Sequence, residues 1–419
     1  MKKTPKGLTF TFVKLWDLYR DRDCAITPSL ERIRKALEHL NNPQRNFPSL
    51  LVGGTNGKGS TCAFLERILR EQGFRTGWFV SPHLVSENER WRVNGRPIED
   101  EVLKFYVRDL RGVMERFDLT YFEAATLIAL LYFRDSRVDV AVLEVGMGGR
   151  WDATKVSEPI VVAITNVERD HTRWLGRTVE EIAEDKLHLF VPGKPLVLGS
   201  SRYPLYTKAL ELGYSGVVAA GIDYTYRGEV VGARTYLKNY SFGSLSIAEA
   251  ELGLLGRWQA DNAALALTLA ELAFDLDEDR IPPALSGTRW EGRMEVLRED
   301  PLLVVDGSHN PYAVAKAVKE VSRIFGEVDI LFTGLKEKDW KLSLELIRRY
   351  RDTIYLIQVN HHRGESLSTL AEHARKLGFR KIHLLRSAEE VWFLERSVCA
   401  LGSLYLVGEI KEARRHTVI

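Results

Sequence analysis

The residues with the clearest chemical use lie between positions 54 and 60, where the sequence is Gly-Thr-Asn-Gly-Lys-Gly-Ser. Glycines let backbone N–H groups approach phosphate oxygens, because they have no Cβ to collide with them. Lys58 adds a positive charge for the outer phosphates, and the Ser60 hydroxyl can ligate Mg²⁺ or cap a helix. An apolar run before the loop and helical periodicity after it predict a strand and a helix, whose N-terminus attracts anions. We therefore expect a triphosphate-binding loop.

This loop departs from the common pattern G-x-x-x-x-G-K-[ST] at two places. Val52 stands where the first glycine is expected, and Gly59 is inserted between the lysine and the serine. The alternative is a glycine-rich turn that only caps a helix. The strand–loop–helix context, together with the lysine and the serine, favours phosphate binding.

Three further side chains follow predicted strands at the same sheet edge. Glu144 ends an apolar run, and a buried carboxylate costs several kcal/mol unless it is paired or coordinated. Ligands bind at the carboxyl ends of strands in such sheets, so we interpret Glu144 as a Mg²⁺ ligand, with a structural ion pair as the alternative. Ser81 and His171 follow two other strands. Each is either a metal ligand or an ordinary hydrogen-bonding residue, and position alone does not decide.

Lys186 lies on the apolar face of a predicted helix. Thr178 and Glu181 form a capping box, which marks the start of this helix. Apolar residues surround the lysine at helical spacing: Ile182, Ala183, Leu189 and Phe190. Burial should lower the pKa of the amine, and a neutral amine can be carbamylated by CO₂ to give an anionic metal ligand. From these residues alone, a lysine that extends to solvent is the favoured alternative.

A second polar cluster, "VDGSHNP", lies between a predicted strand and a predicted helix in the C-terminal part of the chain. Asp306 can accept hydrogen bonds from ribose hydroxyls, and His309 lies beside it. Asn310 suits the N-cap position before Pro311, and capping is compatible with binding. Arg293, near a predicted domain boundary, could reach a phosphate from the second domain, which would make catalysis depend on domain closure.

The elements that would position these side chains alternate between strands and helices. Apolar runs predict strands at 49–54, 76–81, 138–146 and 161–167, and helical spacing predicts helices at 28–41, 61–73, 101–116, 122–134 and 262–272. Residues 200–250 favour a small β-rich excursion. Such alternation is typical of a mainly parallel α/β sheet.

A second α/β alternation follows a boundary expected near residues 287–295. Its predicted strands are 302–307, 328–334, 353–359, 381–385 and 403–408. We therefore predict two domains, 1–288 and 293–419, and a chain of 419 residues is long enough for two cores.

Composition limits the classes of partner. Lys plus Arg number 59 and Asp plus Glu number 57, so the net charge of +2 does not favour nucleic acid or an anionic membrane. The most apolar helical run, 122–133, is too short to span a bilayer. Cys24, Cys62 and Cys399 are too few and too far apart for a disulfide framework or a zinc site, which favours a reducing cytoplasm. The basic N-terminus lacks the apolar stretch of a signal peptide.

A series of sequence blocks resembles the folylpolyglutamate synthase/dihydrofolate synthase family of Mur-type amide ligases. In chain order, over roughly residues 30–410, they are "GGTNGKGS", "SPHLVSENERWRVNG", "EVGMGGRWDAT", "ITNVERDHTRWLGRTVEEIAEDK", "GRWQADNAALAL", "WEGRMEV", "VDGSHNP" and "GSLYLVG". The resemblance implies an α/β fold in which a P-loop ATPase domain with a mainly parallel sheet precedes a smaller Rossmann-like domain. The active site is then expected between the two domains.

The resemblance also implies roles for individual residues. Phosphates would be bound by Asn56, Gly57, Lys58, Gly59 and Ser60, and the nucleotide by Asn262, Arg293 and Asp306. Metal ligands would be Ser81, Glu144, His171 and carbamylated Lys186. Catalytic residues would be Lys58, Lys186 and His309, and substrate would contact Arg150, Asp152 and Ser403.

Two blocks depart from the family pattern. The family usually has "GGRLDATN", where this chain has Trp151 for the leucine and Lys155 for the asparagine. The family commonly has "EKAGI" around the modified lysine, where this chain has "DKLHLF". We expect these changes to affect fine specificity and to leave the ATP chemistry intact. The segment before the P-loop is short, so the dihydropteroate site of bifunctional members is not transferred residue by residue.

The implied reaction joins glutamate to a pterin-bearing carboxylate through an acyl phosphate. ATP, L-glutamate and a folate or dihydropteroate would be the substrates, and the cofactors would be two Mg²⁺ ions together with K⁺ or another monovalent cation. We expect a monomer that binds neither nucleic acid nor membrane. A peptidoglycan Mur ligase would need a UDP-binding domain before the P-loop, for which the residues before position 54 leave no room. A non-catalytic nucleotide-binding module is the alternative from another class.

Overall fold

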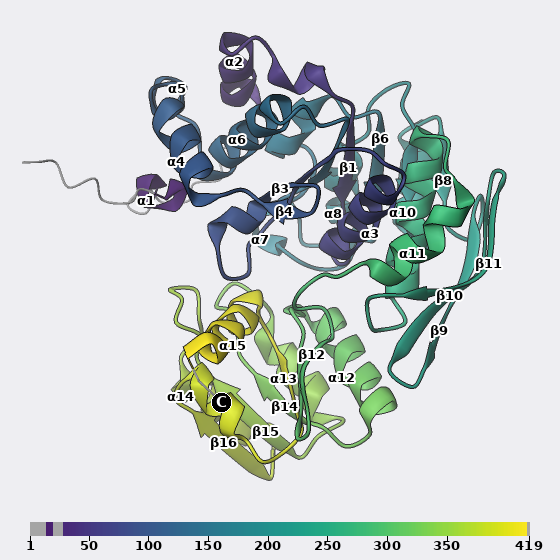
Figure 1. The fold of residues 1–419 in the computed structure, drawn as a ribbon. Helices are drawn as coiled ribbons and strands as arrows, with labels where there is room; N and C mark the ends of the chain where they lie inside the picture. The colour runs from purple at the N-terminus through teal and green to yellow at the C-terminus, as the bar shows by residue number, and fades with distance from the viewer. Residues whose placement is uncertain (1–13, 20–27, 417–419) are drawn as a thin grey trace, which may run out of the picture.

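Residues 14–19 and 28–416 are described by the structure, which is a computed structural model. Cys24 and most of the basic N-terminal segment lie outside the described residues. Figure 1 shows two lobes, the first built from the purple to green part of the chain and the second from the green to yellow part.

An eight-stranded sheet forms the centre of the first lobe, with the strand order β4-β3-β2-β5-β1-β6-β7-β8. The strands are β1 Ser49–Gly53, β2 Thr76–Phe79, β3 Trp91–Val93, β4 Arg96–Pro97, β5 Val140–Glu144, β6 Val161–Ile164, β7 Leu196–Leu198 and β8 Val217–Ala219. All neighbours from β2 to β8 pair in parallel, and β3 and β4 pair antiparallel. Parallel strands place the ends of β1, β5 and β6 at one edge, as the sequence predicted.

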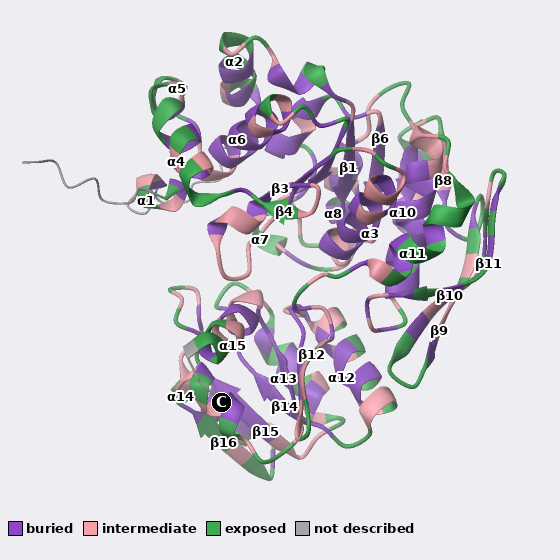
Figure 2. Ribbon diagram, viewed as in Figure 1, coloured by how far each residue is buried: buried purple, intermediate pink, exposed green. Residues whose placement is uncertain are grey.

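Helices cover both faces of this sheet, and Figure 2 shows the buried residues between the layers. One face packs against α1 Leu15–Tyr19, α2 Glu31–His39, α4 Asp100–Asp109 and α6 Tyr121–Asp135, and the other against α3 Lys58–Glu71, α10 Gln259–Ala273 and α11 Ile281–Gly287. The second face also carries an antiparallel sheet of β9 Thr225–Val231, β10 Arg234–Phe242 and β11 Leu245–Leu252. Two shorter helices, α7 Thr172–Leu175 and α8 Val179–Leu187, follow β6.

The second lobe contains a six-stranded sheet with the order β12-β13-β17-β14-β15-β16. Its strands are β12 Glu295–Glu299, β13 Leu302–Val305, β14 Asp329–Phe332, β15 Thr353–Ile357, β16 Lys381–Leu385 and β17 Val398–Leu401. Only β12 pairs antiparallel. Helices α12 Pro311–Phe325, α13 Trp340–Arg348 and α14 Leu367–Lys376 cover one face, and α15 Leu404–His416 covers the other. This arrangement confirms the predicted fold class.

Three expected elements were wrong in detail. Residues 403–408 are the start of α15 and not a strand: the strand is β17, and Gly402, with a φ of 111°, ends it. The expected helix 101–116 is divided at Leu110 into α4 and α5 Arg111–Arg116. The β-rich region 200–250 begins with a helix, α9 Leu205–Glu211. Among the described residues, the helices lack the length and the unbroken apolar run that a membrane crossing requires.

Candidate active site

The phosphate loop connects the end of β1 to the start of α3, and glycine is required at two of its positions. Gly54 and Gly57 have φ values of 134° and 89°, which L-residues rarely adopt. A Cβ on Gly54 would lie 1.9 Å from Thr165 Oγ1, and one on Gly57 would lie 2.3 Å from Asn262 Oδ1. The first hydrogen bond of α3 runs from the Thr61 N–H to the Gly57 carbonyl (2.9 Å), so the N–H groups before Thr61 have no partner within the helix. These donors and the helix dipole suit a phosphate.

Gly59, the residue inserted relative to the common pattern, faces an aromatic ring. A Cβ at this position would lie 2.7 Å from the indole nitrogen of Trp290, in the segment that leads to the second lobe. Trp290 also packs on Trp78, with the ring centroids 4.7 Å apart. The insertion therefore lets the loop pass close beneath Trp290.

Two lysines converge on one carbonyl of the loop. Lys58 Nζ donates to the carbonyls of Gly54 (3.3 Å) and Thr55 (3.2 Å), and Lys186 Nζ donates to Gly54 O (2.9 Å). Lys186 is buried on α8, which begins with the predicted Thr178–Glu181 capping box. Burial lowers the pKa of Lys186 to about 7, and the charge of Lys58 contributes to this shift. Lys186 therefore does not reach solvent, which makes the carbamylation hypothesis chemically reasonable; carbamylation itself stays a prediction.

Glu144 and Ser81 lie side by side at the ends of β5 and β2. The Ser81 N–H donates to Glu144 Oε2 at 3.3 Å, and Glu144 is 5% exposed. Burial raises the pKa of Glu144, and the charge of Lys58 partly offsets that effect. A buried carboxylate with one long hydrogen bond favours a nearby cation.

The two lobes meet at Asp170 and His171, which follow β6. Lys338, from the second lobe, donates to Asp170 Oδ1 (2.6 Å) and lies 3.2 Å from His171 Nε2. His309 Nε2 lies 3.5 Å from Asp170 Oδ2. Burial alone would raise the pKa of Asp170, but the hydrogen bond to His309 and the charge of Lys338 hold it well below its usual range. Burial lowers the pKa of His171 to about 3, so its ring is neutral at physiological pH.

The predicted metal ligands fit a divalent cation only in part. The Glu144 carboxylate and the neighbouring Ser81 supply oxygen donors, which Mg²⁺ prefers. His171 Nε2 instead contacts Lys338, and Lys186 Nζ contacts the Gly54 carbonyl. In residues 14–19 and 28–416, no three His, Cys, Asp or Glu side chains are grouped so that they could hold a metal ion. The wider ligand set therefore stays a prediction.

Three asparagine side chains, from Asn166, Asn262 and Asn310, contact the phosphate loop and the start of α3. The Asn56 N–H donates to Asn166 Oδ1 (3.0 Å), and Asn310 Nδ2 reaches from the second lobe to Asn56 Oδ1 (2.8 Å). Asn262, on α10, accepts from Thr61 Oγ1 and so lies beside the phosphates predicted for this loop. Asn310 is also the N-cap of α12, as the sequence predicted.

Asp306 and Arg293, the other two residues expected to bind the nucleotide, form hydrogen bonds at the start of the second lobe. Asp306 accepts from the Met294 N–H and the Ser308 N–H, both at 2.9 Å. Arg293 Nη1 donates to the Gly292 carbonyl (3.0 Å), and its charge lowers the pKa of Glu144 across the lobe boundary. The carboxylate of Asp306 is engaged by its own turn, and Arg293 acts on Glu144 of the first lobe through its charge.

The three residues expected to contact substrate do not form one cluster. Ser403 is buried and accepts from the Tyr405 N–H (3.0 Å) at the start of α15. Asp152 is buried and accepts from the N–H groups of Met147 and Thr154, both at 3.0 Å. Arg150 is exposed and lines a different pocket. Any substrate contact by these three residues stays a prediction.

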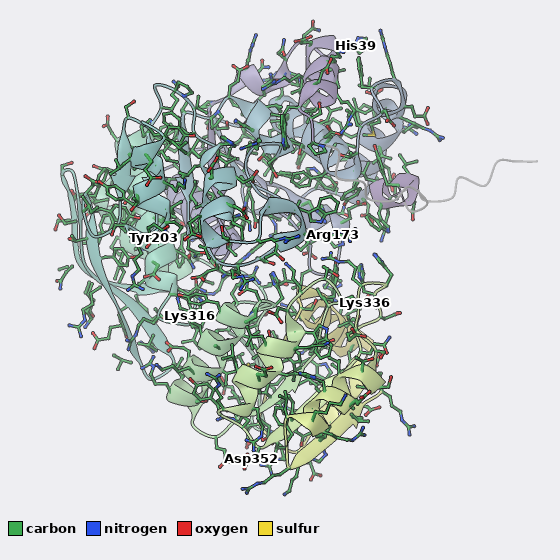
Figure 3. The ribbon with its side chains drawn as sticks, turned by 180° about the vertical axis from the view of Figure 1, so that it is seen from behind. His39, Arg173, Tyr203, Lys316, Lys336 and Asp352 are labelled. Atoms are coloured by element: carbon green, nitrogen blue, oxygen red, sulfur yellow. The ribbon has the colours of Figure 1, made fainter. Side chains whose placement is uncertain are left out.

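Lys338, Asn166 and Trp290 are site residues that sequence reasoning missed. Lys338 lies between Glu337 and Asp339 in a segment of alternating charge, where lysines are ordinarily solvated. Its partner Asp170 is 168 positions away, so no local signal joins the two. Figure 3 shows the labelled Arg173 and Lys336 on opposite sides of the junction between the lobes, where this site lies.

Comparison with known proteins places both lobes in one family. The family model described as the Mur ligase middle domain matches residues 52–270, and the one described as Mur ligase, glutamate ligase domain matches residues 292–405. A probable bifunctional folylpolyglutamate synthase/dihydropteroate synthase of Haloferax volcanii is 32% identical over 97% of this chain and 50% of its own length. The chain thus spans about half of this relative. The dihydrofolate synthase/folylpolyglutamate synthase of Escherichia coli is 30% identical over 86% of this chain and 85% of its own.

Solved structures agree with this placement. Escherichia coli FolC in complex with DHPP and ADP is 28% identical and has a TM-score of 0.85, covering 96% of this chain and 97% of that chain. A bifunctional folylpolyglutamate synthase/dihydrofolate synthase with Mn, AMPPNP and L-glutamate bound is 28% identical and has a TM-score of 0.84, covering 97% and 100%. The chain therefore belongs to the Mur ligase family and, within it, to the dihydrofolate synthase/folylpolyglutamate synthase group.

Proposed function

We propose that this protein is an ATP-dependent ligase that joins L-glutamate to the carboxylate of a folate, of 7,8-dihydropteroate, or of both. The observation that carries the proposal is the meeting of a phosphate loop with a polar cluster of the other lobe. Asn310 bonds Asn56 of the loop, and His309 and Lys338 reach Asp170. The relatives that carry these activities in their names and the neighbour with AMPPNP and L-glutamate bound support it.

The reaction proceeds in two displacements. The acceptor carboxylate attacks the γ-phosphorus of ATP, the bond to the bridging oxygen breaks, and an acyl phosphate and ADP form. The glutamate amine then attacks the acyl carbon, loses a proton, and expels phosphate. Because an anionic nucleophile approaches a polyanion, the site must offset like-charge repulsion. The N–H groups at the start of α3 and the ammonium of Lys58 supply fixed positive charge for the phosphates.

The oxygens of Glu144 and Ser81 would hold Mg²⁺, which neutralises phosphate charge when it is bound. The proposal includes two such ions, with His171 and carbamylated Lys186 among their ligands. It also includes a monovalent cation. For His171 to take part, the Lys338 ammonium must first move away from its Nε2 nitrogen, which it approaches to 3.2 Å. Because Lys338 comes from the second lobe, metal binding at His171 would change a contact between the lobes.

ADP release is the direct test, measured with glutamate and with either 7,8-dihydropteroate or tetrahydrofolate as acceptor. We expect release that requires both glutamate and acceptor, that stops on chelation of Mg²⁺, and that is lost in Lys58→Ala. The acceptor that supports release decides between a monofunctional and a bifunctional enzyme. ATP binding without glutamate-dependent release would instead indicate a nucleotide-binding module, and near-normal turnover of Lys58→Ala would refute the role of that lysine. A monomeric state and a cytoplasmic location stay predictions.

A further inference from the structure

The linker between the lobes passes from one lobe to the other over a very short stretch. Trp290 packs against the first lobe, where its ring lies on Trp78 with the centroids 4.7 Å apart. Gly292 is fixed to the second lobe, since its carbonyl accepts from the Gly307 N–H (2.9 Å). Only Glu291 lies between these two attachments. A change in the angle between the lobes therefore acts on the chain at Glu291.

An ion-pair cluster holds the linker on the side of the second lobe. Lys411, on α15, lies 2.9 Å from Glu291 and 2.6 Å from Glu295. Glu295 also accepts from the Gly292 N–H (2.7 Å). Lys411 is partly buried, so water screens these pairs less than it screens a pair on the open surface. The linker after Trp290 therefore follows any movement of α15.

On the side of the first lobe, Trp290 is held by its ring faces. The Arg92 guanidinium lies over the rings of both Trp290 (5.3 Å to the centroid) and Trp78 (5.4 Å). The indole N–H of Trp290 is buried and has no hydrogen-bond partner among the residues that the structure describes. Stacked planar groups can slide without breaking a hydrogen bond, so the ring can shift together with the linker.

The same ring faces the first turn of the phosphate helix. A Cβ on Gly59 would lie 2.7 Å from Trp290 Nε1 and 3.3 Å from Cε2, so the ring and the Gly59 backbone are in close contact. The Gly59 N–H is one of the donors at the start of α3 that lack a partner within the helix and suit a phosphate. Because the two groups are close-packed, a shift of the ring displaces this donor.

We propose that Trp290 is a positioning residue, through which the orientation of the second lobe sets the geometry of the phosphate-binding amides. The inference rests on the proposed function, because it requires that the loop binds a nucleotide. It also gives a reason for a glycine directly after Lys58, where the common pattern has serine or threonine: a side chain there would collide with Trp290. Nucleotide affinity then depends on contacts of the second lobe that do not touch the nucleotide.

A double-mutant cycle on ADP affinity tests this coupling. Trp290→Leu removes the ring, and Lys411→Met removes the ion pairs that fix the linker to α15. ADP is titrated calorimetrically, with Mg²⁺ present, into the unsubstituted protein, both single variants and the double variant. Each single variant should bind ADP at least about threefold more weakly, which is the lower end of coupling between residues in contact. In the Trp290→Leu background, Lys411→Met should cause no further loss.

Lys376→Met is the matched control, because it removes a lysine of the second lobe that pairs with Glu372 on α14. It should leave ADP affinity unchanged in both backgrounds. If Trp290→Leu does not fold, Trp290→Phe, which keeps an aromatic ring on Trp78, takes its place in the cycle. The assignment would be overturned if Lys411→Met had the same effect with and without Trp290, or no effect on the unsubstituted protein.

Fluorine NMR of protein labelled with 5-fluorotryptophan provides the second readout. The signal of Trp290 is assigned by its loss in Trp290→Phe. It should shift when ADP is added and also in the nucleotide-free Lys411→Met variant, whereas the signal of Trp16, on α1, should stay in place. A Trp290 signal that responds to neither change would contradict the coupling. Absence of ADP binding would refute the proposed function together with this inference, whereas ADP binding with additive substitutions would refute only the role of Trp290.

Discussion

At the scale of single residues, two lysines of the site share one hydrogen-bond acceptor, the Gly54 carbonyl. Both Lys58 and Lys186 donate to it, and their positive charges repel each other. Because Lys186 is also buried, its pKa falls to about 7, so a substantial fraction of the amine is neutral at physiological pH. A neutral amine reacts with CO₂, whereas an ammonium does not. The structure therefore creates the condition that carbamylation needs.

Lys186→Ala should lose most of its ligase activity, and added acetate should restore part of it. A small carboxylate would enter the space of the side chain and replace the anionic carbamate. The measurement is ADP release with and without acetate, with Lys208→Ala, a partly buried lysine of α9 that pairs with Glu211, as the control. Rescue by methylamine and not by acetate would show that the site needs a cation, and would contradict carbamylation.

Gly59→Ala should weaken ATP binding and lower the thermal midpoint. The new Cβ would lie 2.7 Å from Trp290, and over-packing typically costs about 1–3 kcal/mol. Gly112→Ala is the matched control, because nothing lies within 4 Å of a Cβ at that position of α5. The control should be neutral or more stable by about 0.4–1 kcal/mol. If both variants bound ATP equally well, Trp290 would not restrict the loop.

At the scale of elements, loops of the second lobe gain order from aromatic and capping contacts. Ser403 caps α15, and the ring of Tyr405 stacks on His361 with centroids 4.0 Å apart. His361 Nδ1 accepts from the Arg363 N–H (3.3 Å), which requires a ring nitrogen without a proton. Burial, together with the charges of His362 and Arg363, lowers the pKa of His361 to about 4.

His361 should make the second lobe less stable in mild acid. Its folded pKa lies below the ordinary value of 6.5, so its contribution is present above pH 6.5 and is lost as the pH falls from 6.5 towards 4. His361→Gln should therefore show a smaller drop in the urea midpoint between pH 7.5 and pH 5. His362→Gln, at the exposed neighbouring position, should keep most of the drop, because burial is the largest cause of the His361 shift. An unchanged drop in His361→Gln would contradict this assignment.

At the scale of the whole molecule, the two lobes are held together around the phosphate loop and at one side. Lys338 and Asn310 contact the first lobe at the site itself. Away from the site, Glu320 of α12 accepts from the Arg257 N–H, and Arg323 donates to the Val230 carbonyl of β9. These lateral contacts do not depend on Lys338 or Asn310, so they would remain if the contacts at the site were broken.

Lys338→Met should open the junction. Without the ammonium, the buried carboxylate of Asp170 loses its cation, and breaking such a pair typically costs about 3–5 kcal/mol. We expect a larger radius of gyration in small-angle scattering of the nucleotide-free protein, and slower ligation. Lys336→Met, which removes an exposed lysine two residues away, should leave both unchanged. Identical scattering of the two variants would mean that the lateral contacts alone fix the lobes.

The sequence by itself determined what depends on neighbours along the chain. The glycine loop, the capping box before Lys186, the Asn310 cap and the buried parallel strands were all visible as local patterns, because backbone geometry and helix ends respond to nearby residues. Residues 403–408 were misassigned because a short apolar run fits a strand and a buried helix equally well. Only the tertiary structure decided that Lys338 meets Asp170, that Trp290 covers Gly59, and that Arg34 faces Lys155. Those contacts join residues that are far apart along the chain, and they form only when whole layers and lobes pack together.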